Sequence, residues 1–280
     1  MAAGAGIHPI MIPWIVLGNF VRKIYLQRNL IRNFVIRDLK ARFIGSFIGF
    51  FWSVIHPIVL LVSYYFVFAI ILQVHPPGDS GTGNFALYLF CSILPWLFFQ
   101  DVIQRSSTII VENANLVTKT IFPTEILPVT MLLAGVVNHV IGFAILLGIV
   151  VYALGKISVF ILLVPVYFLF LMFFTLGLSW LVAGLNVFVR DVSQVLGVIL
   201  TFWFWFTPIF YSPERFPKRI LFLVKLNPLA HVVAGYRDCI IRMRMPDLEM
   251  LAILAVSSVA VFAIGGLFFR HMKREFVEVL

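Results

Sequence analysis

Charged side chains are unusually scarce in this chain. Asp, Glu, Lys and Arg make up 12% of its 280 residues, whereas soluble domains use roughly 25%. Hydrophobic residues reach 62%. This composition excludes a water-soluble globular domain and is typical of a protein embedded in a membrane.

Cysteines are rare in the sequence, and acidic residues in the middle of the chain and a nucleotide-binding loop are missing. The two cysteines are too few for a disulfide framework. No acid occurs from residue 126 through residue 190, which disfavours a carrier driven by protons or sodium ions, because such carriers hold the ion with buried carboxylates or broken helices. The single Gly-Lys pair, at 155 and 156, lacks the upstream glycine of a phosphate-binding loop. This chain is therefore not expected to bind ATP.

Long apolar stretches fill most of the sequence. A helix of about 20 apolar residues crosses a bilayer, where every backbone N–H and C=O must be paired internally. The runs are continuous rather than alternating, which argues against transmembrane strands. We predict an all-α integral membrane protein, with residues 1–280 forming a single transmembrane domain of six transmembrane helices. The expected spans are about 49–72, 85–104, 126–153, 159–185, 195–211 and 251–269.

The segment before the first span is basic and amphipathic. Residues 20–43 carry seven Lys or Arg against one acid, Asp38, which predicts an interfacial helix along anionic lipids. Asp38 and Arg42 fall on its apolar arc, where their four-residue spacing allows pairing, and Asp101 and Arg105 share that spacing. Alternatively, the basic residues only fix the orientation of the first span. The residues expected to serve the interfacial helix are Arg32, Arg37, Lys40 and Arg42.

Lys and Arg near the spans predict the orientation in the membrane. Basic residues concentrate in cytoplasmic loops, and seven of them precede the first span, whereas the loop at 74–84 has none. Six crossings then place both termini in the cytoplasm. Segment 212–249 would be external although it holds seven basic residues, which is the weakest point of this topology. The net charge of +9 requires no nucleic acid partner, because bases facing anionic lipid account for it.

Segment 212–249 alternates prolines with short apolar runs, at 220–224 and 229–233. Proline breaks a helix, and broken helices at membrane depth survive only where protein or a water-filled cavity covers them. We therefore expect two short re-entrant or interfacial helices that form an external gate region of a pathway. The alternative is an ordinary amphipathic loop.

Several stretches resemble one protein family. They are RDLKARFIGSFIGFFWSVIHP (37–57), ENANLVTKTIFPTEILP (112–128), LNVFVRDV (185–192), TPIFYSPERFP (207–217) and NPLAHVVAGYRD (227–238). In this order, they are similar to the permease subunits of bacterial polysaccharide ABC exporters, especially those for O-antigen, and of the related teichoic acid and capsule exporters. The resemblance covers most of the chain from about residue 30 onward.

The resemblance implies a transport subunit rather than an enzyme, located in the bacterial inner membrane. It implies a homodimer that binds two cytoplasmic ATPase subunits, with ATP and magnesium on those partners and no cofactor or metal in this chain. The substrate would be an undecaprenyl-linked glycan moved to the external side. Alternatives are another export substrate (teichoic acid, capsule or a drug) and a membrane-embedded transferase. A transferase would need a polar catalytic cluster, whereas His56, His139 and His231 are scattered singly.

Segment 112–128 matches the part of the family that couples to the ATPase. The resemblance implies a coupling helix here, and the segment offers asparagines suited to a helix N-cap and an apolar face suited to a groove. The alternative is a passive connection. The residues expected at the ATPase contact are Glu112, Asn115, Leu116, Lys119, Phe122 and Glu125, with Arg190 and Asp191 in another short loop as a second contact or an inside anchor.

Aromatic residues are the candidates for the wall of the pathway. Five of them are consecutive at 202–206, and successive helical residues are turned by about 100°, so they cannot all face lipid. Aromatic faces also suit the C–H faces of sugars. For any single ring, packing in the bilayer or between helices is the alternative. The candidate set is Phe47, Phe51, Trp52, Tyr65, Phe202, Trp203, Phe206 and Tyr211.

Overall fold

The computed structural model describes residues 25–42, 49–76, 81–119, 122–213, 217–219 and 221–280. Every regular element among these residues is helical. Five helical segments in this part of the chain are long and apolar enough to cross a membrane, and one further apolar helix is shorter. They match the six expected spans. Their bounds are Val54–Ile71, Phe85–Glu112, Ile126–Leu154, Val159–Phe188, Leu248–Met272 and, for the shorter helix, Val192–Phe206.

The helical elements divide into an N-terminal and a C-terminal half of the chain. The N-terminal half contains α2 (Arg28–Ala41), a first span made of η1 (Gly49–Phe51), α3 (Trp52–Tyr65) and the π-helical η2 (Phe66–Ile71), then α4 (Phe85–Glu112), α5 (Ala114–Lys119) and α6 (Ile126–Leu154). The C-terminal half contains η3 (Val159–Leu163), α7 (Val164–Phe188), α8 (Val192–Phe206), α9 (Leu221–Leu226), α10 (Pro228–Arg237), the π-helical η5 (Asp238–Arg242), α11 (Leu248–Met272) and α12 (Phe276–Val279).

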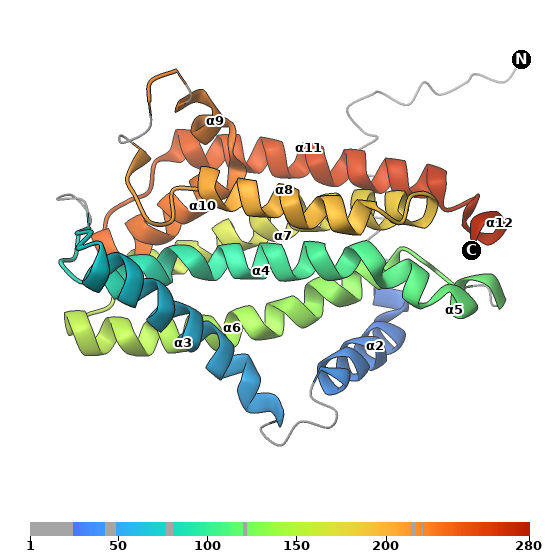
Figure 1. Ribbon diagram of the computed structural model, residues 1–280, viewed down its shortest axis with the longest axis horizontal. Helices are drawn as coiled ribbons and strands as arrows, with labels where there is room; N and C mark the ends of the chain where they lie inside the picture. The colour runs from blue at the N-terminus through green and yellow to red at the C-terminus, as the bar shows by residue number, and fades with distance from the viewer. Residues whose placement is uncertain (1–24, 43–48, 77–80, 120–121, 214–216, 220) are drawn as a thin grey trace, which may run out of the picture.

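The long helices lie side by side along the long axis of the molecule (Figure 1). α2, α5 and α12 lie toward one end of this bundle, which we name the α5 end. α9, α10 and the start of α4 lie toward the other, the α9 end. α3 runs obliquely across the bundle (Figure 1). The spans follow one another along the chain in the order expected from the six apolar runs.

Polar residues at the helix ends determine where several helices begin. The side chain of Asn84 accepts hydrogen bonds from the backbone N–H groups of Ala86 and Leu87 at the start of α4. Asp247 caps α11 in the same way, through the N–H of Glu249. Such caps satisfy backbone donors that have no partner inside the helix. At its C-terminus, α6 ends on Gly155, whose φ of 66° is the left-handed conformation that glycine adopts readily.

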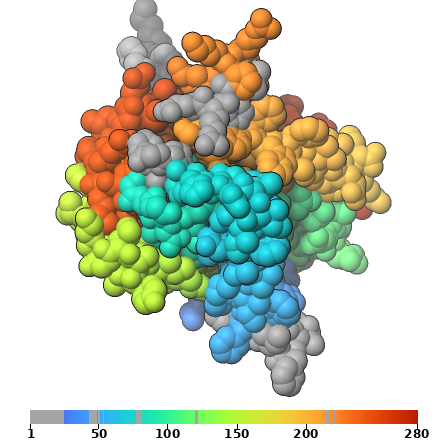
Figure 2. Space-filling model, turned by 60° about the vertical axis from the view of Figure 1, so that its left-hand side comes forward, coloured from blue at the N-terminus to red at the C-terminus, as the bar shows by residue number. Residues whose placement is uncertain are grey.

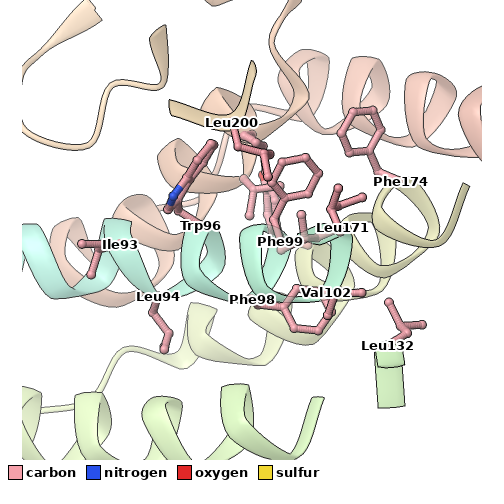
Figure 3. Close-up of a cluster of buried hydrophobic side chains, with 14 of the residues drawn as sticks. Ile93, Leu94, Trp96, Phe98, Phe99, Val102, Leu132, Leu171, Phe174 and Leu200 are labelled. Atoms are coloured by element: carbon pink, nitrogen blue, oxygen red, sulfur yellow. The ribbon is translucent and has the colours of Figure 1, made fainter. Parts of the chain in front are cut away.

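Helix α4 forms the centre of the bundle, whereas α3 lies at its edge. In the most apolar 18-residue window of α4, 78% of the residues are buried, and in the corresponding window of the first span none is. Side chains of α4 such as Phe98, Phe99 and Val102 reach toward neighbours on α6 and α7 (Figure 3). Figure 2 shows α3, in blue to cyan, on the surface of the molecule. The protein therefore has a packed scaffold and one loosely attached helix.

Helices α7 and α11 pack closely against each other through two glycines. A Cβ atom placed on Gly265 would lie 2.1 Å from the carbonyl oxygen of Gly177, and a Cβ on Gly177 would lie 2.4 Å from the carbonyl oxygen of Val261. No side chain fits at these distances. Small residues at helix contacts in membranes allow backbones to approach closely.

The second span is longer than expected. The sequence predicts its end near residue 104, but α4 continues to Glu112, past the charged residues Asp101 and Arg105. The charges are accommodated by pairing, since Asp101 and Arg105 bind each other, Arg105 binds Asp38 of α2, and Asp101 binds Arg42, which follows α2. A charge that pairs with a neighbouring element does not end a helix.

The expected pair of short helices in segment 212–249 is present as α9 and α10. α9 is largely exposed, whereas α10 is buried against α4, α7 and α11, and η5 is buried against α4 and η3. Asn227 starts α10 by accepting a hydrogen bond from the N–H of Leu229, with Pro228 in the first turn, where its missing N–H costs nothing. α10 is therefore a short helix enclosed by protein.

Buried pairing accounts for part of the basic charge in this segment. The Arg237 guanidinium donates to Ser92 Oγ at 2.7 Å and to the carbonyl oxygen of Ile209 at 2.6 Å, and it lies 3.7 Å from the centre of the Tyr88 ring. Arg242 and Arg244 both bind Asp238, at 3.0 and 2.8 Å. Three of the seven basic residues thus have protein partners. They therefore do not indicate on which side of the membrane segment 212–249 lies.

Candidate functional site

A cavity of about 710 Å³ lies between α3, α4, α6 and α8. Its wall includes residues from Trp52 on α3 to Trp205 on α8, and its deepest side is formed by the buried helix α4. Because α3 is loosely attached, the cavity is bounded on one side by the scaffold and on the other by a helix at the edge of the bundle.

Aromatic rings form one part of the cavity wall. Trp96 of α4 lies 5.3 Å from Phe204 of α8, and Tyr64 of α3 lies 6.1 Å from the same ring, measured between ring centroids. The indole N–H of Trp96 donates to Gln100 Oε1 at 2.7 Å, which fixes the ring. Trp52 and Trp205 also line the cavity. Such rings provide flat apolar faces with polar edges.

Uncharged polar groups form a second part of the wall. Gln100 and Gln104 come from α4, Asn138 and His139 from α6, and Thr201 from α8. Gln104 donates to the carbonyl oxygen of Ser193 at 3.3 Å, next to the start of α8. Aromatic faces and uncharged polar groups together suit a ligand that is rich in hydroxyl groups and has apolar faces.

A four-residue ion-pair network lies toward the α5 end, and three of its members, Arg42, Asp101 and Arg105, line the cavity. Asp38 of α2 pairs with Arg42, the residue that follows α2, at 3.3 Å, and Asp101 pairs with Arg105 on α4 at 3.4 Å. Arg42 also binds Asp101 at 3.2 Å, and Arg105 binds Asp38. Burial raises the pKa of the Asp38 carboxyl above its usual range, and the positive charge of Arg42 opposes this rise. Both pairs expected from the four-residue spacing are thus present, and they join α2 to α4.

The other expected residues of the interfacial helix are exposed on α2. Arg32, Arg37 and Lys40 face outward, whereas Arg42 is half-buried in the network. Arg37 donates to Asn113 Oδ1 at 3.1 Å, just before α5, and its guanidinium lies 4.2 Å from the centre of the Phe34 ring. α2 therefore contacts both the cavity helix α4 and the α4–α5 turn.

Only part of the expected pathway set lies at the cavity. Trp52 lines it, whereas Phe51, Tyr65, Phe202, Trp203, Phe206 and Tyr211 are not among its lining residues, and Phe47 falls outside the described residues. Trp203 instead packs against Phe99, with centroids 5.2 Å apart, and donates to Asn227 Oδ1 at 2.9 Å. Phe202 is 64% exposed on the outer side of α8. The run of aromatics at 202–206 is thus divided between the core, the cavity and the outer surface.

The expected coupling segment, residues 112–128, contains the short helix α5. Its backbone starts on Asn113, whose carbonyl oxygen accepts from the N–H groups of Leu116 and Val117. Asn115 and Lys119 are exposed and Leu116 is half-buried, whereas Val117 is buried in the core. The helix therefore combines an anchored apolar side with an accessible polar side.

The remaining expected contact residues have mixed environments. Glu112 is exposed and accepts a hydrogen bond from Thr108 at 2.6 Å. Phe122 packs on Phe34, with centroids 5.6 Å apart. Glu125 pairs with Lys273, next to the C-terminal helix, at 3.3 Å. The other two, Arg190 and Asp191, are exposed in the connection between α7 and α8.

A second groove, of about 500 Å³, separates the α5 segment from the C-terminal residues. Val117, Lys119 and Phe122 line one side, and Lys273 and Val277 line the other. The groove combines apolar and basic side chains at the end of the bundle that carries α5.

Comparison with known proteins gives one family and several relatives. The family described as ABC-2 type transporter matches residues 29–241. An O-antigen export system permease protein of Myxococcus xanthus is 30% identical over 261 residues, which cover 92% of this chain and 98% of the relative. One of the same description from Klebsiella pneumoniae is 26% identical over 87% of this chain and 92% of the relative. A polysialic acid transport protein of Escherichia coli is 24% identical over 88% of this chain and 94% of the relative.

Proposed function

The chain belongs to the ABC-2 type transporter family, and we propose that it forms the pathway through which an O-antigen type, lipid-linked polysaccharide leaves the cytoplasm. As a membrane subunit of such an exporter, it is a transport protein and not an enzyme. ATP hydrolysis belongs to a separate subunit that the family implies.

The cavity between α3, α4, α6 and α8 carries the proposal. Relatives of this chain are described as permeases for O-antigen and as a transport protein for polysialic acid, and both are polysaccharides. The cavity wall combines aromatic rings with uncharged amide, imidazole and hydroxyl groups, and it also includes the paired charges of Arg42, Asp101 and Arg105. Aromatic faces pack on the C–H faces of sugars while polar groups bind their hydroxyls. A purely apolar wall, as a hydrophobic drug would need, does not have this chemistry.

The proposed assembly is a homodimer with two cytoplasmic ATPase subunits that bind ATP and magnesium. A single subunit leaves the first span almost unburied, and it leaves an apolar stripe on α8 exposed, including Val195, Val198 and Phe202. Their spacing of three or four residues places them on one helix face. A second copy packed against α3 and α8 would cover this stripe and close the cavity into a passage.

The proposed coupling element is α5, on the cytoplasmic side of the bacterial inner membrane together with both termini. α5 presents Asn115 and Lys119 to solvent, and it is joined to the scaffold through Val117. The contacts of α2 extend the linkage, since Arg37 reaches the turn before α5 and the ion-pair network reaches the cavity. Movement of α5 on nucleotide binding would thus be transmitted to the cavity helices.

A genetic experiment tests this function. Deleting the gene for this chain should remove its polysaccharide from the cell surface and leave lipid-linked glycan inside, and both effects should be reversed by a plasmid copy. A cell that lacks only the partner ATPase should show the same defect. Normal surface glycan after deletion, or glycan transfer catalysed by the purified chain alone, would contradict the proposal and, in the second case, favour a transferase.

A further inference from the structure

Helix α9 carries apolar side chains that the protein does not cover. Phe222 and Leu226 are 55% and 69% exposed, and Leu223 is exposed as well. Phe222 and Leu226 are four residues apart and therefore lie on one face of the helix. Large apolar side chains that gather on a surface are unfavourable in water and mark contact with a partner or with lipid. This face of α9 therefore needs an occupant.

The attachment of α9 to the rest of the protein holds this face outward. Val224, on the opposite side of the helix, is buried. The carbonyl oxygen of Lys225 accepts a hydrogen bond from His231 Nε2 of α10 at 2.8 Å. The side chain of Asn227, which follows α9, accepts one from the indole N–H of Trp203 on α8. α9 is thus a fixed element whose exposed face has a defined direction.

Figure 1 places α9 within the length of the bundle. Along the long axis, α9 lies level with the first turns of α11, and α6 extends beyond it toward the same end. α6 has 29 residues, so at the usual rise per residue it is about 44 Å long. This length is about that of a bilayer with its headgroup layers. The exposed face of α9 is therefore at the level of the bilayer surface and not in the water beyond it.

Basic side chains accompany the apolar face. Lys218, Arg219 and Lys225 are exposed, and no acid occurs between residues 217 and 226. Lys and Arg side chains can lay their carbon chains along apolar surface while the charged ends reach the phosphate layer. Apolar side chains next to several bases are typical of surfaces that bind anionic lipid.

A second copy of the chain matches this surface less well. Two copies that met through α9 would bring the same bases together, and like charges that face each other oppose association. An anionic phospholipid complements both parts of the surface. Its phosphate group pairs with the bases, and its acyl chains cover the apolar side chains.

We propose that α9, together with Lys218 and Arg219, forms a binding surface for anionic phospholipid. The three bases bind the headgroup phosphates, and Phe222 and Leu226 enter the upper part of the acyl layer. This inference concerns the membrane around the protein and does not depend on the transported substrate. Because α9 is bonded to α10 and, beyond its end, to α8, bound lipid holds both helices at a fixed level relative to the bilayer surface.

The first test measures the depth of α9 in the membrane. A nitroxide spin label is attached to Leu226→Cys in the full chain, which is reconstituted in nanodiscs of phosphatidylcholine and phosphatidylglycerol. The accessibility of the label to oxygen, which dissolves in lipid, is compared with its accessibility to a nickel chelate, which stays in water. We expect oxygen to reach the label more readily. The wild-type chain, whose two cysteines are buried, gives the labelling background.

Two outcomes of this measurement would overturn the lipid surface. A label reached mainly by the chelate would place α9 in water. A label shielded from both reagents would assign the face to a second copy of the chain.

The second test measures lipid selectivity at the same position. A fluorophore on Leu226→Cys is quenched by nitroxide-labelled phosphatidylglycerol or, in parallel, by nitroxide-labelled phosphatidylcholine. We expect phosphatidylglycerol to bind about tenfold more tightly, because each base near the surface attracts anionic lipid. Replacing Lys218, Arg219 and Lys225 together by Gln should remove this preference.

A matched control removes the same number of positive charges elsewhere. It replaces by Gln three exposed bases at the α5 end, namely Lys119, Arg190 and Arg274. This variant should keep the preference for phosphatidylglycerol at α9. Equal quenching by the two lipids in the chain with all its bases, or equal losses of selectivity in the two Gln variants, would contradict the proposal.

Discussion

Arg237 donates a hydrogen bond to the carbonyl oxygen of Ile209 across 2.6 Å, and both residues are buried. The bond joins α10 to the segment that follows α8, and the same guanidinium reaches Ser92 on α4. One side chain thus connects three parts of the bundle at the α9 end. The last turn of the cavity helix α8 is held in place through this connection.

Replacing Arg237 by Leu should destabilise the protein. The substitution leaves the carbonyl oxygen of Ile209 and the hydroxyl of Ser92 without this donor in a buried environment, at a cost of about 2–4 kcal/mol in the free energy of unfolding. Thermal unfolding in detergent measures the effect. Arg219→Leu is the matched control, because Arg219 is exposed. Equal unfolding temperatures for the two variants would show that the buried contacts do not stabilise the fold.

Adding a methyl group to Gly265 should separate α7 from α11. The new Cβ would lie 2.1 Å from the carbonyl oxygen of Gly177, so the helices must move apart, which costs about 1–3 kcal/mol. The unfolding temperature of Gly265→Ala in detergent should fall accordingly. Gly148→Ala is the control, since no atom lies within 4 Å of a Cβ at Gly148, and it should unfold at or slightly above the wild-type temperature.

Replacing Asp38 by Ala should loosen α2. The change leaves Arg42 and Arg105 with Asp101 as their shared partner, and we expect a loss of about 1 kcal/mol of local stability because the pairs are partly exposed. Backbone hydrogen exchange in residues 30–40 should become faster while exchange in α4 is unchanged. Arg32→Ala, an exposed position on the same helix, should leave the exchange as it is. Unchanged protection in the Asp38 variant would show that apolar packing alone holds α2.

Reversing the charge of Lys119 should weaken binding of the ATPase, if α5 is the docking element. Lys119 is exposed on α5 and lines the basic groove, and a charge change at an interface rim commonly lowers affinity by about tenfold. Co-purification and the dissociation constant of the complex measure this. Lys156 is exposed just after the C-terminus of α6, whereas α5 precedes the N-terminus of α6. The variant Lys156→Glu should bind the ATPase normally. Weaker binding in the Lys156 variant instead would place the ATPase at the other end of the bundle.

The sequence was sufficient to predict the helices, because membrane burial selects apolar runs of fixed length. Five long spans, the shorter fifth apolar run and the two short helices before α11 are all present. Local spacing also predicted the pairs Asp38–Arg42 and Asp101–Arg105. Their union into one network could not be predicted, because it depends on how α2 lies against α4. For the same reason, the length of α4 was underestimated.

The cavity wall was harder to predict than the spans. Aromatic content identified α3 and α8, but the rings that line the cavity on these helices include Tyr64, Phe204 and Trp205, and the sequence does not fix the rotation of a helix that is apolar on all sides. The polar pair Asn138 and His139 in the middle of an apolar run was the available signal.

The contrast between the buried α4 and the peripheral α3 has a consequence for inherited variation. Substitutions in the scaffold would cause the polypeptide to misfold, and quality-control proteases would degrade it. Substitutions in α3 would leave full-length, correctly inserted subunits that do not transport substrate. Loss-of-function alleles should therefore fall into two classes by protein abundance, and the boundary between the classes should follow the cavity that separates α3 from α4, α6 and α8.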